Sequence, residues 1–285
     1  MQPPARRPEI HRSRVAIVTG AAGGIGQAFV RALLADGMRV LAVDKLDAPL
    51  RALEKSMHEA HGSDRSQALA VDLLAPGASE QIVETALRTF GDLDVLVNNA
   101  GIGQGSIRSD NWHNPLRFWE VEPAHWERFF AINSTATFLL SRQAAPHMVS
   151  KRWGRIVNIT TSLGSMLRRG YTPYGPSKAA AEALTSVMAH DLAGTGVTAN
   201  VLVPGGVTNT PMVPDASRFD RSKLLQPEVM VPPLRFLISE EAAEINGQRF
   251  LAIDWDVALT PKVAAAKAGA PVAWRSIATM PVFPT

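Results

Sequence analysis

The chain alternates short apolar runs with segments of helical periodicity, and this alternation limits its possible folds more than any other feature. The first run, Val15–Thr19, is β-branched and ends in glycines, and apolar residues then recur at helical spacing from Ile25 to Ala35. Similar runs follow at 39–44, 68–72, 93–101, 154–160 and 197–205. Strands that are apolar on both faces and separated by helices predict a parallel sheet covered on both sides. We expect a single-domain α/β fold with a Rossmann-type doubly wound parallel sheet.

The composition agrees with one large domain. Of the 285 residues, 46% are hydrophobic, which is enough to fill a large core. No internal repeat, low-complexity segment or change of composition marks a second domain. We predict a flexible N-terminal tail over 1–12, a Rossmann domain over 13–256 and a C-terminal extension over 257–285. The extension begins with an alanine-rich helical stretch and could cover a neighbouring subunit or pack on its own domain.

Charge and residue usage exclude several classes of protein. The 29 Lys and Arg and the 26 Asp and Glu are spread along the chain, so nucleic acid is not an expected partner. The chain contains no cysteine, which excludes disulfides and thiolate chemistry. No run has the length of a membrane span, no secretory signal is recognisable, and no His, Asp and Glu spacing indicates a metal site. We expect a cytoplasmic protein without membrane partners.

The first glycine cluster indicates a nucleotide-binding turn. Thr19–Gly26 follows the first predicted strand and opens the first predicted helix, so backbone N–H groups can approach a pyrophosphate at the positive helix end. Asp44 ends the second run, where its carboxylate can accept both ribose hydroxyls of an adenosine and repel a 2′-phosphate, which favours NAD. A plain tight turn and a solvated aspartate are the simpler explanations, and Lys45 leaves NADP use open.

A tyrosine and a lysine four residues apart are the candidate proton-transfer groups. Tyr174 and Lys178 share one face if a helix begins at Tyr174, and Pro176 fits the first turn of such a helix. Transfer of a hydride to or from a carbinol carbon requires a matching proton transfer at oxygen. Tyr174 would act as general acid and base, and we expect the nearby ammonium to lower its pKa.

These segments together resemble the short-chain dehydrogenase/reductase family over about residues 14 to 254. Gly20, Gly24 and Gly26 match its TGxxxGxG loop, residues 98–101 match its NNAG segment, and Tyr174 with Lys178 matches YxxxK. The resemblance implies an NAD-dependent oxidoreductase that interconverts a small-molecule secondary alcohol and its carbonyl form, and that assembles as a homotetramer or homodimer. The alternatives are a non-catalytic NAD-binding sensor or scaffold and an NADP-dependent ketoacyl-type reductase.

The resemblance also assigns further site residues. Asn133 matches an asparagine that holds a water in a proton relay from the lysine. Thr161 lies thirteen positions before Tyr174, where the family has a serine that holds the substrate oxygen, and Ser162 is the alternative. The expected cofactor-binding residues are Gly20, Gly24, Ile25, Gly26, Asp44, Asp72, Leu73, Asn99, Ala100, Gly101, Tyr174, Lys178, Pro204, Gly205, Val207 and Thr208. Asp72 is explained nearly as well by a generic turn, and Thr210 could take the place of Thr208.

Three regions leave open questions about specificity. The connection 102–125 carries four aromatic residues that could roof the substrate pocket or form a satellite core or subunit contact: Trp112, His113, Phe118 and Trp119. Arg168 and Arg169 could bind an anionic substrate or lie on a solvated edge. Near the C-terminus the family's DGG is replaced by Asp254-Trp255-Asp256.

Overall fold

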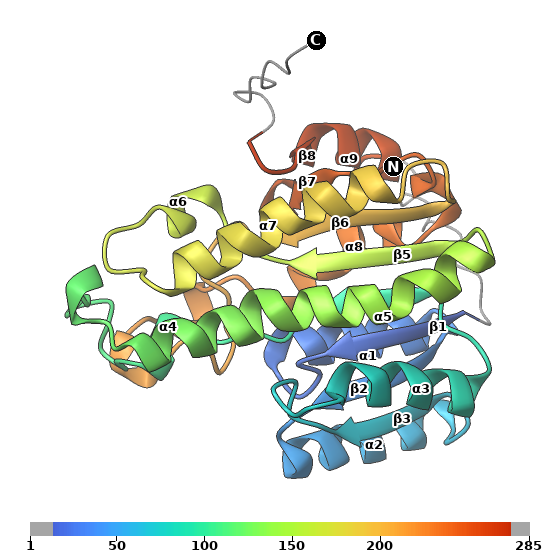
Figure 1. Cartoon of the computed structure of the whole chain (residues 1–285), viewed down its shortest axis with the longest axis horizontal. Helices are drawn as coiled ribbons and strands as arrows, with labels where there is room; N and C mark the ends of the chain where they lie inside the picture. Colours follow the sequence, from blue (N-terminus) through green and yellow to red (C-terminus); the bar gives the residue numbers. More distant parts are fainter. Residues whose placement is uncertain (1–13, 275–285) are drawn as a thin grey trace.

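The computed structural model describes residues 14–274, and it contains one mostly parallel sheet (Figure 1). The strand order is β3-β2-β1-β4-β5-β6-β7-β8, and only the β7–β8 pair is antiparallel among these strands. The strands are β1 (Val15–Thr19), β2 (Arg39–Asp44), β3 (Ser66–Ala70), β4 (Val95–Asn98), β5 (Gly154–Ile159), β6 (Val197–Val203), β7 (Gln248–Leu251) and β8 (Gly269–Pro271). The order reverses direction between β1 and β4, as in a doubly wound fold. The predicted fold class is confirmed.

Helices cover both faces of the sheet (Figure 1). They are α1 (Gly24–Ala35), α2 (Asp47–His61), α3 (Ala78–Phe90), α4 (Pro123–Phe130), α5 (Ala136–Ser150), α6 (Leu163–Met166), α7 (Tyr174–Asp191), α8 (Val231–Leu237) and α9 (Pro261–Ala268). A π-helical turn, η3 (Ala131–Thr135), joins α4 to α5 in one long helix.

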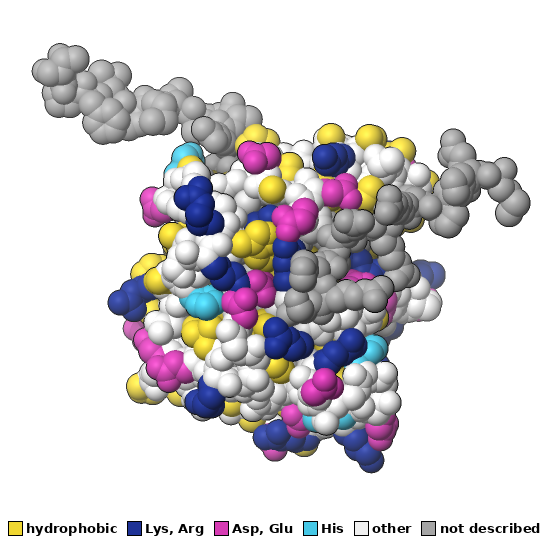
Figure 2. Space-filling view, turned by 90° about the vertical axis from the view of Figure 1, so that its right-hand side faces the viewer, with side chains coloured by type: hydrophobic (Ala, Val, Ile, Leu, Met, Phe, Trp, Pro, Cys, Tyr) yellow, Lys and Arg dark blue, Asp and Glu magenta, His cyan; other side chains and the backbone are white. Residues whose placement is uncertain are grey.

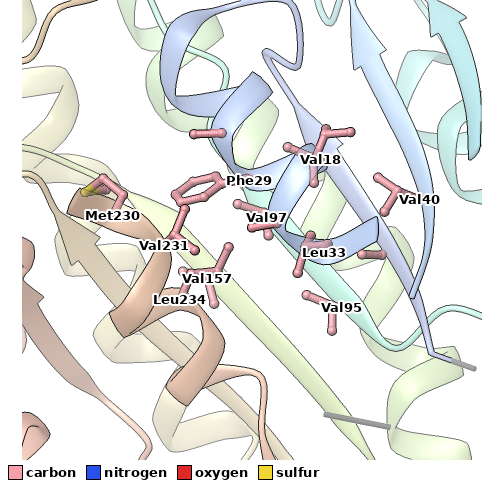
Figure 3. Close-up of a cluster of buried hydrophobic side chains, with 14 of the residues drawn as sticks. Val18, Phe29, Leu33, Val40, Val95, Val97, Val157, Met230, Val231 and Leu234 are labelled. Atoms are coloured by element: carbon pink, nitrogen blue, oxygen red, sulfur yellow. The ribbon is translucent and has the colours of Figure 1, made fainter. Parts of the chain in front are cut away.

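Alternation along the central strands builds two cores, one on each face. In β1, Ala16 and Val18 belong to a cluster with side chains of α1, α2 and α8, whereas Val15 and Ile17 belong to one with α3, α5 and α7. Phe29 and Leu33 of α1 are fully buried in the first cluster (Figure 3). Because successive side chains of a strand point to opposite faces, an all-apolar strand must be covered twice.

The strand boundaries follow the sequence prediction with two clear shifts, one of which is that β4 covers only Val95–Asn98 of the predicted run 93–101. The third strand was expected at 68–72, but β3 ends at Ala70. The Asp72 carboxylate accepts the N–H of Leu74 at 3.0 Å, so a local Asx turn starts where the prediction still placed a strand.

The described part of the C-terminal extension packs on its own domain. Its helix, α9, was predicted, and it buries Ala264, Ala265 and Ala268. Strand β8 was not predicted; it pairs with β7 at the sheet edge. The proposed tail at 1–12 and residues 275–285 lie outside the described residues. Among residues 14–274, no helix is both long and apolar enough to cross a membrane.

Candidate active site

A cavity of about 720 Å³ lies at the carboxyl ends of the strands, where doubly wound sheets bind ligands. In Figure 1 these ends point toward α4 and α6. All sixteen predicted cofactor-binding residues line the cavity, and so do Thr161 and Thr210. Asn133 is not among the lining residues.

The loop between β1 and α1 is shaped by glycines that no larger residue could replace. Gly20 has φ +64°, and a Cβ there would lie 2.9 Å from the Cα of Ala100. A Cβ on Gly26 would lie 2.1 Å from the carbonyl oxygen of Gly20. Helix α1 follows Gly23, which makes no side-chain cap. Its first-turn N–H groups, which have no partners within a helix, therefore face the cavity as potential anion donors.

Hydrogen bonds fasten the NNAG segment to this loop. The Thr19 hydroxyl accepts the N–H groups of Asn99 and Ala100, each at 3.0 Å. The Asn99 amide donates to the carbonyl oxygens of Thr19 and Gly20 at 2.8 and 3.2 Å. Asn98 turns the other way and donates to Asn158 of β5 at 2.8 Å. Asn98 thus ties β4 to β5, whereas Asn99 and Thr19 tie the NNAG segment to the glycine loop.

Asp44 lies where an adenosine ribose would be expected. Its two carboxylate oxygens accept the N–H groups of Ala22 and Leu46, each at 3.0 Å, so backbone donors on both sides hold the carboxylate in place. Each oxygen keeps capacity for another donor such as a ribose hydroxyl.

The lining groups fit a nicotinamide dinucleotide. The open first turn of α1 suits a pyrophosphate, and the Asp44 carboxylate suits a ribose. Apolar Val71 and Leu73 line the cavity beside Asp44 and suit the edge of a base. The glycines of the β1–α1 loop would let its backbone N–H groups approach a pyrophosphate where a side chain would block the contact.

Tyr174 begins α7, as predicted, and Lys178 follows one turn later on the same face. Burial raises the pKa of Tyr174 to about 12, although a side-chain hydrogen bond with Thr161 opposes this shift. Burial lowers the pKa of Lys178 to about 8. The Lys178 ammonium donates to the Ile159 carbonyl at 2.9 Å. The expectation that this ammonium lowers the tyrosine pKa is wrong here, because desolvation of the phenolate outweighs every favourable contact.

Thr161 and Ser162 have different hydrogen-bond partners. Thr161 shares a hydrogen bond with Tyr174, whereas the Ser162 hydroxyl lies 3.2 Å from that of Ser165 in α6. Thr161, the residue thirteen positions before Tyr174, is therefore the one of the two that interacts with the Tyr174 hydroxyl.

Asn133 connects three segments behind the cavity. Its side chain accepts the N–H of Ile102 at 2.9 Å and donates to the Ile102 carbonyl at 3.1 Å and the Ser177 hydroxyl at 2.9 Å. It lies in the π turn η3, a distortion that is frequent at functional sites. These bonds hold the connection after β4 against α7.

A buried ion pair behind Thr161 was missed by the sequence reasoning. The Glu182 carboxylate is 2.8 Å from the Arg249 guanidinium and accepts the Thr160 hydroxyl at 3.1 Å. Arg249 also donates to the Thr161 carbonyl at 3.3 Å. Because Glu182 follows Lys178 by four residues, it lies on the catalytic face of α7, and that spacing was the available signal.

The loop after β6 forms the far wall. Gly205 has φ +91°, and the Thr208 hydroxyl donates to the Gly206 carbonyl at 3.3 Å. Pro204 and Val207 complete this wall.

The aromatic residues of the connection 102–125 divide into two groups. Trp112 lines the cavity and packs edge-on against Tyr171 and Phe219 at centroid distances of 6.0 and 4.9 Å. Phe118 and Trp119 are 70% and 69% exposed and pack edge-on against each other instead. Of these residues, Trp112 lines the cavity and Phe118 and Trp119 do not.

The departure at Asp254-Trp255-Asp256 has a packing explanation. Trp255 lies 5.5 Å from the ring of Phe236 and 6.4 Å from that of Phe250, measured between centroids. Its ring covers the first core cluster.

The sequence model described as short chain dehydrogenase matches residues 14–220. The chain is 32% identical to a short-chain type dehydrogenase/reductase of Picea abies over 254 residues, which cover 82% of this chain and 89% of the relative. It is 32% identical to a 3-oxoacyl-[acyl-carrier-protein] reductase of Synechocystis over 246 residues, covering 84% and 94% of the two chains. The protein belongs to the short-chain dehydrogenase family and is an oxidoreductase of that type.

Solved structures agree with this assignment. A putative short chain dehydrogenase from Pseudomonas syringae superposes with a TM-score of 0.75 at 29% identity, covering 88% of this chain and 100% of the other. A putative NAD(P)-dependent gluconate 5-dehydrogenase from Beutenbergia cavernae gives 0.70 at 30% identity, covering 85% and 96%, and it holds NADP at low occupancy.

Proposed function

We propose that the protein transfers a hydride between NAD and a secondary alcohol or ketone, with Tyr174 as general acid and base. The observation that carries the proposal is that Tyr174, Thr161 and Lys178 line the same cavity as the glycine loop. The Thr161 hydroxyl holds the substrate oxygen beside the phenol. When bound, the nicotinamide supplies or accepts the hydride.

Tyr174 handles the proton. A pKa of about 12 keeps the phenol protonated at neutral pH, so it gives its proton to the substrate oxygen during carbonyl reduction and recovers it during alcohol oxidation. Lys178, with a pKa of about 8, carries a positive charge at neutral pH and would hold the ribose of the nicotinamide. The Asn133 segment would hold the relay water, since its side chain fixes the connection that adjoins Lys178.

NAD is the proposed cofactor because of Asp44. Its carboxylate would accept ribose hydroxyls and repel a 2′-phosphate. Calorimetric titration should show tighter binding of NADH than of NADPH, and Asp44→Ala should reduce the difference by roughly tenfold, or ~1.4 kcal/mol. Lys45→Ala is the opposite case, because it removes the adjacent cavity-lining positive charge and keeps the carboxylate, so it should not reduce the preference for NADH. Equal affinities in the wild-type protein would contradict the assignment.

Among the relatives, the 3-oxoacyl-[acyl-carrier-protein] reductase of Synechocystis suggests a second candidate, an NADP-dependent reductase of oxoacyl groups. Screening alcohols, ketones and oxoacyl thioesters against both cofactors by nicotinamide absorbance separates the candidates. Preferred turnover of thioesters with NADPH would favour the second one. A protein that binds cofactor but turns over no member of such a panel would instead match a sensor or scaffold.

We also propose a homodimer or homotetramer built on the face formed by α4, α5 and α7. Trp126, Phe138 and Val187 are large apolar side chains that this face exposes. Helices α5 and α7 lie side by side on the outside of the sheet (Figure 1). Sedimentation of the wild-type protein and of Phe138→Glu tests the assignment, and a wild-type monomer would overturn it.

A further inference from the structure

A second cavity of about 360 Å³ adjoins the first at its substrate end. Four residues line both cavities and form the partition between them: Asn111, Trp112, Arg168 and Tyr171. Its other lining residues are His113, Pro115 and Arg169. The two spaces are therefore neighbours whose common wall contains one cation, Arg168.

The charges around this wall have one sign. No Asp or Glu is among the residues that line the second cavity, within the part of the chain that the structure describes. The acidic residues that line the first cavity are Asp44, the last residue of β2, and Asp72, two residues after β3, at the far side of the sheet. An anionic group would therefore meet Arg168 and Arg169 without a competing carboxylate in the lining.

Arg168 is held in place by aromatic rings instead of an acidic partner. Its guanidinium carbon lies 4.4 Å from the ring centroid of Trp112 and 4.9 Å from that of Tyr171, and it donates to the Tyr171 hydroxyl at 3.3 Å. No ion pair of Arg168 occurs among residues 14–274. Stacking restrains the guanidinium plane but leaves most N–H groups free, and such a fork matches a carboxylate in a bidentate manner.

One aromatic ring separates this cation from the proton-transfer group. The ring of Tyr171 packs edge-on against Tyr174 at 6.0 Å between centroids, and it also contacts Arg168. Met212 and Val213 add apolar surface to the same cavity. A substrate with a short apolar spacer could therefore place its hydroxyl-bearing carbon at Tyr174 and its acid group at Arg168.

We propose that the substrate is a hydroxy acid or oxo acid whose anionic group is bound by Arg168 at the wall between the two cavities. The proposal rests on the proposed function, since Tyr174 must act on the same molecule. It makes Arg168 a specificity-determining residue. The second cavity would provide space beside the bound acid group.

The test compares matched acids and neutral analogues. Hydroxyhexanoate with its hydroxyl next to the terminal methyl group, and its methyl ester, are assayed with NAD on wild-type protein, Arg168→Gln, Arg168→Lys and Arg117→Gln. Arg117 is the matched control because it also stacks on a tryptophan, Trp119, at 5.9 Å but lines neither cavity. Hexanoate and hexanamide binding, measured by calorimetry with bound NADH, gives a readout without turnover.

Arg168→Gln should lower kcat/KM for the acid at least tenfold and leave the ester nearly unchanged, whereas Arg117→Gln should change neither. Arg168→Lys should recover part of the loss, because it restores the charge but not the bidentate geometry. Equal loss on acid and ester, or equal binding of hexanoate and hexanamide by the wild-type protein, would overturn the proposal. If the ester is turned over while Arg168 has no effect on the acid, the anion site fails but the proposed function stands. If hexanoate binding depends on Arg168 but the protein turns over neither the acid, nor the ester, nor any member of a wider panel of alcohols and ketones, the anion site stands and the proposed function fails.

Discussion

The two ends of the parallel sheet treat charged side chains in opposite ways. At the amino ends, acids and bases lie in contact: Asp92 accepts from Lys151 and His147 at 2.6 and 2.7 Å, and Arg14 pairs with Glu240. At the carboxyl ends, Lys178 donates to the backbone carbonyl of Ile159 and Arg168 lies over aromatic rings, and neither forms an ion pair among residues 14–274. Ligand-binding groups must stay available, so these two cavity-lining cations have no acidic partner, whereas the Glu182–Arg249 ion pair at the same end lies behind the cavity.

The face at the amino ends shows this pairing on its surface. Figure 2 looks onto that face, where Lys and Arg side chains are interspersed with Asp and Glu. Beneath it, the Trp153 ring lies between the guanidinium groups of Arg14 and Arg155, at 3.4 and 4.3 Å from its centroid. Burial lowers the pKa of Arg155 to about 10, and the nearby Glu240 carboxylate opposes that shift. With a pKa of about 10, Arg155 still carries its charge at neutral pH.

The largest expected effect is on the carboxyl end. Tyr174→Phe keeps the ring and its packing but removes the assigned proton donor, so turnover should fall by about a hundredfold or more. NADH affinity and thermal stability should stay close to wild type, because the glycine loop and Asp44 are unchanged. Steady-state kinetics, calorimetry and thermal unfolding check the three expectations. Wild-type turnover in this variant would show that the mechanism is wrong even though the fold is right.

The opposite pattern is expected from the amino end. Asp94 is only 6% exposed and accepts the Val15 N–H at 2.7 Å and the Lys151 ammonium. Asp94→Ala should lower the free energy of unfolding by about 1–3 kcal/mol, because a buried N–H loses its acceptor.

Turnover of the folded Asp94→Ala protein should not change. Asp47→Ala is the control: this exposed acid pairs with Arg51 on a helix surface, and its loss should change stability by about 0.5 kcal/mol or less. Chemical denaturation measures both. If Asp94→Ala lowered both kcat/KM and the free energy of unfolding, the two ends of the sheet would not be independent.

A smaller difference should separate two neighbouring hydroxyls at the carboxyl end. Thr161→Ala should reduce kcat/KM about tenfold, the equivalent of one hydrogen bond to the reacting oxygen. Ser162→Ala removes a bond to Ser165 at the start of α6 and should have a much weaker effect. The reverse ranking in steady-state kinetics would identify Ser162 as the group that holds the substrate oxygen.

The smallest effect should be a pH dependence at the amino end. Burial opposes ionisation of Asp92, but hydrogen bonds from His147 and Lys151 prevail and lower its pKa to about 2, below the ordinary value of 3.8. A carboxyl group with a lowered pKa stabilises the fold above its ordinary pKa and loses this contribution as the pH falls toward 2.

Asp92→Asn should therefore be less stable than the wild type above pH 4, by about 1 kcal/mol or less because solvent screens this partly exposed group. The difference should disappear near pH 2. Denaturation at several pH values measures it, and a difference that persists near pH 2 would mean that packing, not charge, is the cause.

The sequence predicted those features whose signals are local. The glycines of the first loop, the end of β2 at Asp44 and the start of α7 at Tyr174 each depend on a few neighbouring residues, and the structure has them where they were expected. The residue count from Tyr174 back to Thr161 also selected the hydroxyl that meets the phenol.

What the sequence could not predict depends on distant partners. Arg249 and Glu182 are 67 positions apart, so the helical spacing that puts Glu182 on the same face as Lys178 does not indicate its partner. The π turn at Asn133 and the raised pKa of Tyr174 both arise from surrounding packing. Strand β8, of sequence Gly-Ala-Pro, has no strand propensity of its own and forms because β7 offers a free edge.

Strand β8 also limits how the sheet can grow. An exposed sheet edge is a template on which another chain can add a strand, and proteins counter this with short edge strands and proline. Strand β8 has three residues and ends in Pro271, which has no N–H to donate. It pairs with Gln248–Phe250 of β7, so the exposed edge of the sheet is the three-residue strand β8 instead of the four-residue strand β7. The described part of the C-terminal extension thereby leaves the sheet with an edge that is poorly suited to adding another strand.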